Sequence, residues 1–182
     1  MKIDASVIQR LSQGDREAYT AVFREYYAPL VVYSSRIVKE REIAEDIVQE
    51  VLIRLMQSAG VFEDESHEKA WLLKVASNLC KDKLKSASRQ REVAIPEGYD
   101  VADEKQEQKE ESDILQIISQ LPEKYRSAIH LYYYEEYSVK EIAEILEKKE
   151  TTIRSLLKRG REKLARMLPQ QMKGDDGHAA GI

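Results

Sequence analysis

The sequence is poor in the residues that build disulfide frameworks, metal centres and turn-rich folds. Its 182 residues include one cysteine, three histidines, seven glycines and four prolines. Because Cys80 is alone, no disulfide can form within the chain, and His67, His130 and His178 are too far apart in the sequence to suggest ligands of one metal ion. Few glycines, few prolines and few alternating β-branched stretches favour helices. We therefore predict an all-α protein with no structural metal and no cofactor.

Long apolar runs are also missing. No stretch approaches the roughly 18 apolar residues of a membrane span, and the N-terminal stretch MKIDASVIQRLSQGD lacks the uninterrupted apolar core of a signal peptide. With 42% apolar and 34% charged residues, the composition is that of an ordinary folded protein. We expect the protein to be cytoplasmic.

Charges of the two signs lie in separate segments, although the formal net charge is only −4. Residues 69–91 are rich in Lys and Arg and include a single acid, Asp82, whereas acidic residues far outnumber lysines in residues 92–113. The apolar content of the last residues is too low for packing. We therefore predict four parts: a helical domain over residues 1–91, an acidic linker over 92–113, a second helical domain over 114–168 and a disordered tail over 169–182.

Two helical patterns define the first domain. Apolar residues recur at helical spacing over residues 42–55 and again over about 68–86. The second pattern places four polar residues on one face, namely Lys74, Asn78, Lys81 and Lys85. Upstream, Asp15 is a candidate N-cap, and we expect Pro29 to end the helix that begins there. The domain should be a bundle of about four helices.

The second domain has the pattern of a helix-turn-helix. Ser138 followed three residues later by Glu141 predicts a capping box, and a short polar turn, EKKE, separates that helix from the next. The next stretch, TTIRSLLKRGREKL, carries basic residues on one face, namely Arg154, Lys158 and Arg161. Like charges at this spacing cost about a few tenths of a kcal/mol each, and contacts with phosphate groups would offset that cost. The helix is therefore predicted to enter the major groove of DNA.

Four segments of the sequence follow one another in an order that is highly specific when they occur together. They are EIAEDIVQEVLIRL (residues 42–55), AWLLKVASNLCKDKLKS (70–86), LPEKYRSAIHLYYYEEYSVKEIAEIL (121–146) and TTIRSLLKRGREKL (151–164). In order and spacing the chain resembles, from about Ser6 to Leu168, the small bacterial sigma factors of the extracytoplasmic-function (ECF) group of the sigma-70 family. The resemblance implies two small helical domains, similar to sigma regions 2 and 4. It also implies binding to core RNA polymerase, recognition of promoter DNA and promotion of strand opening.

The resemblance also carries roles over to particular residues. The family's counterpart of residues 42–55 docks on the polymerase, which makes candidates for core polymerase binding of Glu45, Asp46, Gln49 and Glu50. The loop near residues 58–66 would capture a flipped minus-ten base, and the helix after it would hold the melting strand through Lys74, Asn78, Lys81 and Lys85. The reading helix would contact the minus-thirty-five element through Thr152, Arg154, Ser155, Lys158 and Arg159. The family often pairs such factors with an anti-sigma protein, frequently membrane-anchored.

Other interpretations fit the residues less well. An enzyme would need a convergent set of catalytic groups, and the sequence has no glycine-rich phosphate loop and no Glu-x-x-His pair. The more serious alternative is a stand-alone helix-turn-helix transcription regulator that binds duplex DNA without polymerase. We expect Cys80 to be a core residue, and Trp71 to be either a core residue or a platform for base stacking. The acidic linker could lie against the basic faces and lower stray DNA binding within the free molecule.

Overall fold

The computed structural model describes residues 5–58, 62, 65–94 and 113–168. These residues form helices and connecting turns without a strand, which confirms the all-α prediction. The helices are, in order, α1 (Ala5–Ser12), α2 (Arg16–Val38), α3 (Arg41–Gln57), α4 (Glu65–Ala94), α5 (Asp113–Ser119), α6 (Glu123–Tyr133), α7 (Val139–Ile145) and α8 (Glu150–Met167). Between α4 and α5, most of the predicted acidic linker lies outside the described residues, as does the predicted disordered tail.

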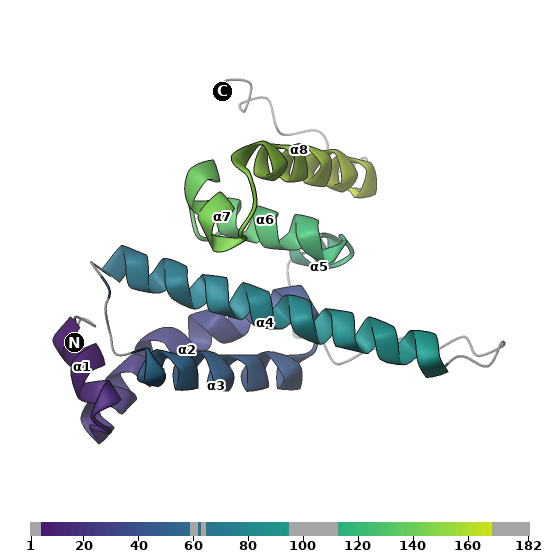
Figure 1. Cartoon of the computed structure of the whole chain (residues 1–182). Helices are drawn as coiled ribbons and strands as arrows, with labels where there is room; N and C mark the ends of the chain where they lie inside the picture. The colour runs from purple at the N-terminus through teal and green to yellow at the C-terminus, as the bar shows by residue number, and fades with distance from the viewer. Residues whose placement is uncertain (1–4, 59–61, 63–64, 95–112, 169–182) are drawn as a thin grey trace.

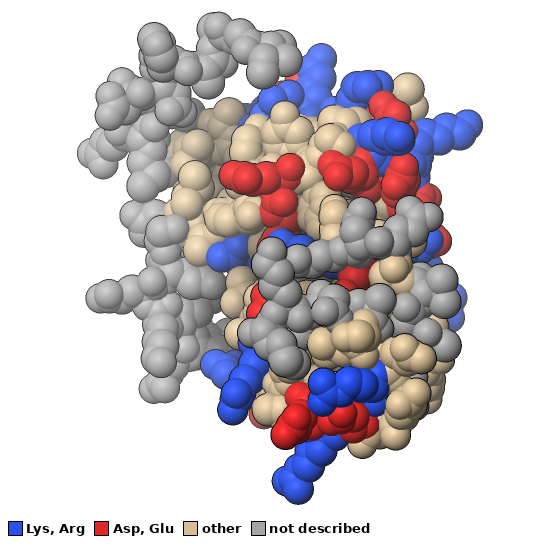
Figure 2. All heavy atoms as spheres, turned by 90° about the vertical axis from the view of Figure 1, so that its left-hand side faces the viewer, with Lys and Arg blue, Asp and Glu red and all other residues tan. Residues whose placement is uncertain are grey.

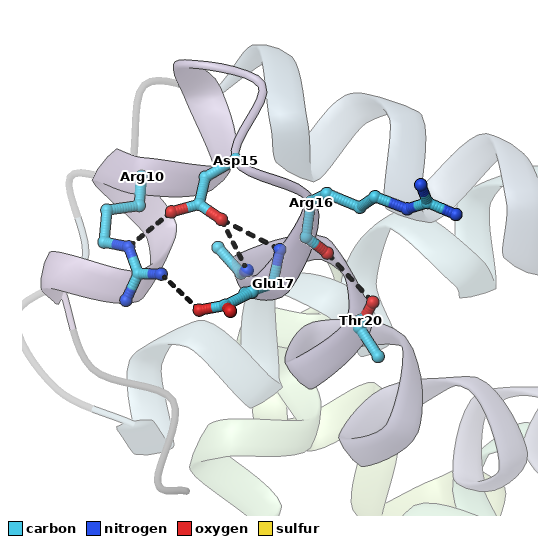
Figure 3. Close-up of polar contacts among 6 residues, drawn as sticks. Arg10, Asp15, Arg16, Glu17 and Thr20 are labelled. Atoms are coloured by element: carbon cyan, nitrogen blue, oxygen red, sulfur yellow. Dashed lines mark hydrogen bonds and ion pairs between the residues drawn. The ribbon is translucent and has the colours of Figure 1, made fainter.

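The start of α2 is fixed by the predicted N-cap. One carboxylate oxygen of Asp15 accepts hydrogen bonds from the backbone amides of Glu17 and Ala18, at 2.8 and 3.2 Å (Figure 3). The other oxygen lies 2.6 Å from the guanidinium of Arg10, which comes from α1. The Arg10 hydrogen bond holds the pKa of Asp15 below its ordinary value. The cap therefore satisfies free amides at the helix start and joins α1 to α2.

The prediction that Pro29 ends this helix is wrong. The structure places Pro29 inside α2, which continues to Val38. Proline lacks an amide hydrogen and disfavours a helix interior by about 3 kcal/mol. The Pro29 side chain is exposed, whereas its neighbours Leu30 and Tyr33 are buried. Burying such large side chains contributes about 1.5 to 3 kcal/mol each, so tertiary packing outweighs the local preference.

The first four helices pack together as the predicted bundle. The apolar face of α3 is fully buried, as its spacing predicted, through Ala44, Ile47, Val48, Val51, Leu52 and Leu55. In Figure 1, α4 lies between the layer of α2 and α3 and the layer of α6 and α7, and its contacts with α2, α3 and α7 agree with that arrangement. The helix begins three residues before its predicted start at about residue 68 and continues eight residues beyond its predicted end at 86.

The remaining helices form the predicted helix-turn-helix. Ser138 and Glu141 make both hydrogen bonds of the capping box, so α7 begins where the sequence indicated. A Cβ added at Gly160 of α8 would lie 2.7 Å from the terminal methyl of Ile129, so α8 and α6 approach closely at this position. In Figure 1, α8 forms the edge of the molecule farthest from α2 and α3.

Candidate nucleic-acid interface

Helix α8 has one buried face and one exposed polar face. Ile153, Leu156, Leu157 and Gly160 are buried. The opposite face exposes all five residues proposed to contact the minus-thirty-five element, namely Thr152, Arg154, Ser155, Lys158 and Arg159. Figure 2 shows Lys and Arg side chains gathered at the upper edge of the molecule, at the height where Figure 1 places α8. The arrangement leaves the basic side chains free to reach a polyanion.

One of these basic residues has an acidic partner within the helix. Arg154 Nη2 lies 2.8 Å from Glu150 Oε2, one turn earlier. Both side chains are substantially exposed, at 62% and 43%. An exposed pair at this spacing contributes about 0.3 to 0.5 kcal/mol, which is little resistance to exchange for a phosphate. The pair therefore orients the Arg154 side chain and can still be exchanged for a contact with a phosphate group.

Helix α4 presents the second basic face, and part of this face is occupied. Lys81 and Lys85 are exposed. Lys74 Nζ lies 2.9 Å from Glu147 Oε1, and the side-chain amide of Asn78 donates to Glu147 Oε2 at 3.5 Å. The hydrogen bond from Lys74 holds the pKa of Glu147 below its ordinary value, with smaller contributions from Asn78 and Lys81. Glu147 belongs to the turn between α7 and α8, so this contact joins the two halves of the chain.

The outer side of α3 carries the four residues proposed for polymerase binding. Two of them pair with arginines of their own helix: Arg41 Nε lies 2.8 Å from Glu45, and Arg54 Nε lies 2.8 Å from Glu50. Asp46 and Gln49 are exposed. The structure therefore brings the four together on one acidic helix face, opposite the apolar residues of α3.

The two halves are joined by a buried guanidinium. Arg126 of α6 is 5% exposed and donates one hydrogen bond to the carbonyl of Ile37, in the last turn of α2, and another to the carbonyl of Ser119, at 2.8 Å. The last carbonyls of a helix lack intrahelical partners and carry partial negative charge. The charge of Arg126 is thus met by backbone oxygens, although burial still lowers its pKa.

A buried histidine completes this junction. His130 Nδ1 lies 3.2 Å from the guanidinium of Arg36, and its Nε2 lies 3.4 Å from a carboxylate oxygen of Glu135. Since arginine can only donate, Nδ1 must accept and Nε2 must carry the hydrogen. Burial lowers the pKa of His130, which favours the neutral form of the ring. The pKa of Glu135 falls to about 2 because it accepts from His130 and lies 3.1 Å from Lys69.

Comparisons with known proteins match both halves. Residues 22–90 match the model of Sigma-70 region 2, and residues 111–164 match that of Sigma-70, region 4. The ECF RNA polymerase sigma factor SigW of Bacillus subtilis is 30% identical over 88% of this chain and 94% of its own. SigM of Mycobacterium tuberculosis is 27% identical over 91% of this chain and 84% of its own. The chain belongs to the ECF group of the sigma-70 family.

Solved structures of other sigma factors share the fold of this one. RpoE of Bartonella quintana, crystallised with the anti-sigma factor NepR, aligns with a TM-score of 0.66 at 21% identity, over 86% of this chain and 98% of its own. CnrH, solved with the cytosolic domain of CnrY, aligns with a TM-score of 0.61 at 16% identity, over 90% of this chain and 96% of its own. These similarities confirm the architecture of two helical domains.

Some polar contacts that join the two halves of this sigma factor were not visible in the sequence. Glu147, Arg126 and Glu135 have partners far away in the chain, and the Glu147 carboxylate meets Asn78 across 69 positions. The core assignment of Cys80 is confirmed, because it is 0% exposed and burial raises its pKa to about 12. Trp71 is partly buried against the core, with its ring centroid 5.6 Å from that of Phe62.

Proposed function

We propose that this sigma factor uses three helix faces for three partners. The acidic face of α3 binds core RNA polymerase, the basic face of α4 holds the melting minus-ten strand, and the exposed face of α8 reads the minus-thirty-five element. The observation that carries the proposal is the pair of basic faces, one on the region 2 helix α4 and one on the region 4 helix α8. Phosphate contacts account for the clustering of positive charge in a chain of net charge −4.

The partners follow from this assignment. Core polymerase and promoter DNA are the two main binding partners, and the protein performs no chemistry of its own. An anti-sigma factor is a third partner, supported by solved structures of similar proteins in complex with the anti-sigma factor NepR and with the cytosolic domain of CnrY. No helix of the described residues is long and apolar enough to cross a membrane. We place the protein in the cytoplasm, where core polymerase acts.

Run-off transcription tests the proposal directly. Purified protein, core polymerase and fragmented genomic DNA should yield discrete transcripts, and omission of either protein should abolish them. A stand-alone regulator would instead protect a specific duplex from nuclease digestion without polymerase, and it would add no transcripts to the core enzyme. That pattern would reject the sigma assignment of the three faces.

A further inference from the structure

The turn between α7 and α8 places a carboxylate on the minus-ten face of α4. Glu147 has a left-handed backbone, with φ of 52°, and its side chain crosses to the first domain. One carboxylate oxygen lies 2.9 Å from Lys74 Nζ, and the other accepts from Asn78 at 3.5 Å. Lys74 and Asn78 are one helical turn apart, so a single carboxylate bridges both residues.

The backbone of Glu147 is in a conformation that glycine adopts more easily. A left-handed conformation is disfavoured for residues with a Cβ, and such strain persists where the surroundings hold it in place. Glu147 is one of three described non-glycine residues with positive φ. Two backbone hydrogen bonds that end α7 hold this conformation, from Glu147 N to Glu144 O at 3.3 Å and from Lys148 N to Ala143 O at 2.9 Å.

The contact occupies part of one DNA-binding face and leaves the other open. In Figure 1, α6 and α7 lie between α4 and α8, and α8 packs against them while its basic face stays exposed. The lysine and amide held by Glu147 are two of the four residues assigned to the minus-ten strand. A carboxylate and a phosphate present similar anionic oxygens to such donors.

We propose that Glu147 is an intramolecular competitor of DNA, which occupies a phosphate position on Lys74 and Asn78 while the two regions are in contact. Separation of region 4 from region 2 withdraws the carboxylate and frees the minus-ten face. The proposal deepens the proposed function and rests on it, because it takes α4 as the surface that holds the melting strand.

The strength of the contact suits a competitor that must be displaced. The Lys74 and Glu147 side chains are 42% and 55% exposed, so water and salt screen the pair. Exposed ion pairs shift equilibria by about two- to fivefold. The competitor should therefore lower DNA binding by the free protein by about that factor, and high salt should remove the effect.

The test measures two properties of the free full-length protein. Glu147→Gln removes the charge and keeps the shape, and Glu144→Gln, an exposed carboxylate in α7, is the matched control. Binding to a fluorescein-labelled oligothymidine is followed by anisotropy. The separation of the regions is followed by double electron–electron resonance, which measures the distance between spin labels at Gln57→Cys and Glu162→Cys. The background carries Cys80→Ala, so that only the two introduced thiols are labelled.

Glu147→Gln should tighten oligothymidine binding by about two- to fivefold at low salt and increase the separated fraction by a similar factor. Glu144→Gln should change neither. In a Lys74→Gln background, Glu147→Gln should have a much smaller effect, because the charged partner is gone and only the 3.5 Å contact with Asn78 remains. Equal effects of the two glutamine variants, or a full effect of Glu147→Gln without Lys74, would overturn the proposal.

The assignment of the faces is judged separately, by run-off transcription with core polymerase. A wild-type protein that yields no polymerase-dependent transcripts would reject the proposed function, whatever the resonance distances show. A wild-type protein that is active with polymerase, but whose Glu147→Gln variant behaves like Glu144→Gln in both measurements, would reject the competitor alone.

Discussion

At the scale of single residues, short-range hydrogen bonds fix the starts of α2 and α7. The Asp15 cap and the Ser138–Glu141 capping box lie where local rules placed them, because donor and acceptor are at most three residues apart. Glu147 was not predictable in this way, since its partners come from α4. A sequence read in one dimension does not indicate which distant lysine an exposed carboxylate will meet.

Substitutions at two residues of α8 test whether its exposed face contacts promoter DNA. Arg154→Ala and Lys158→Ala should each reduce polymerase-dependent initiation. A lost phosphate contact lowers the slope of log affinity against log salt by about one unit, whereas a lost base contact costs about 1 to 3 kcal/mol at one base pair. Arg166→Ala, in the last turn of the same helix, is the control for the loss of one charge. The assignment of this face would be rejected if neither variant changed initiation at any promoter that the protein uses.

Gly160 allows the packing of α8 to be measured. Its Cβ position is 2.7 Å from Ile129 Cδ1, and Ile129 is 1% exposed. Gly160→Leu should therefore lower the free energy of unfolding by about 1 to 3 kcal/mol through overpacking. Ala165→Leu adds a larger side chain at an exposed position of the same helix and should have little effect. Urea denaturation distinguishes the two, and equal stabilities would mean that α6 and α8 can separate without cost.

At the scale of helices, apolar spacing was a reliable guide and proline was not. Every residue of the predicted apolar face of α3 is buried, because helical periodicity and burial express the same geometry. The end predicted at Pro29 was wrong because packing of the buried residues around it outweighs the local preference. Local rules predict where an isolated helix would end, whereas packing in the bundle determines where it ends in the folded protein.

The acidic face of α3 yields a prediction for polymerase binding. Asp46→Lys combined with Glu50→Lys should weaken binding to core polymerase by at least about tenfold, or about 1.4 kcal/mol. The helix should persist, because its buried face is unchanged. Glu25→Lys, an exposed charge reversal on α2, should bind normally. Affinity is measured by titration of labelled core enzyme and helicity by circular dichroism; normal affinity of the double variant would place the polymerase contact elsewhere.

At the scale of the whole molecule, the sequence predicted two domains but not their contact. Charge blocks and apolar periodicity separate the halves clearly. The junction depends on Arg126 and His130, which are 5% and 3% exposed. Their spacing within α6 resembles that of any helix, and only the fold brings them to Ile37 and Arg36 of α2. The hydropathy pattern of a sequence does not reveal polar residues that are buried between domains, because they look like exposed ones.

The junction should make stability depend on pH. The pKa of His130 is lowered in the folded protein, chiefly by burial. On acidification the unfolded chain therefore binds a proton at this histidine before the folded protein does. The free energy of unfolding should not depend on His130 above about pH 6.5, and it should fall as the pH drops below that value. The slope should reach at most about 1.4 kcal/mol per pH unit. The stabilisation from Glu135, with a pKa of about 2, is lost only between its unfolded value and that pH.

Urea denaturation between pH 5 and 7.5 measures the dependence. His130→Gln should flatten the slope below pH 6.5, whereas His67→Gln, at an exposed position, should leave it as in the wild type. A slope that survives His130→Gln would assign the dependence to other groups.

Pro29 divides the hydrogen-bond ladder of α2 into two lengths. It has no amide hydrogen to donate to the carbonyl of Glu25, so one rung is absent in the middle of the helix. The part before it begins at the Asp15 cap, which pairs with Arg10 of α1, whereas the part after it ends at Val38 and includes Ile37, whose carbonyl accepts from Arg126. Amide hydrogens on the two sides of Pro29 should therefore exchange with solvent deuterium at different rates. When region 4 separates, only the later amides should lose protection, and α2 would report the opening of the molecule through one of its halves.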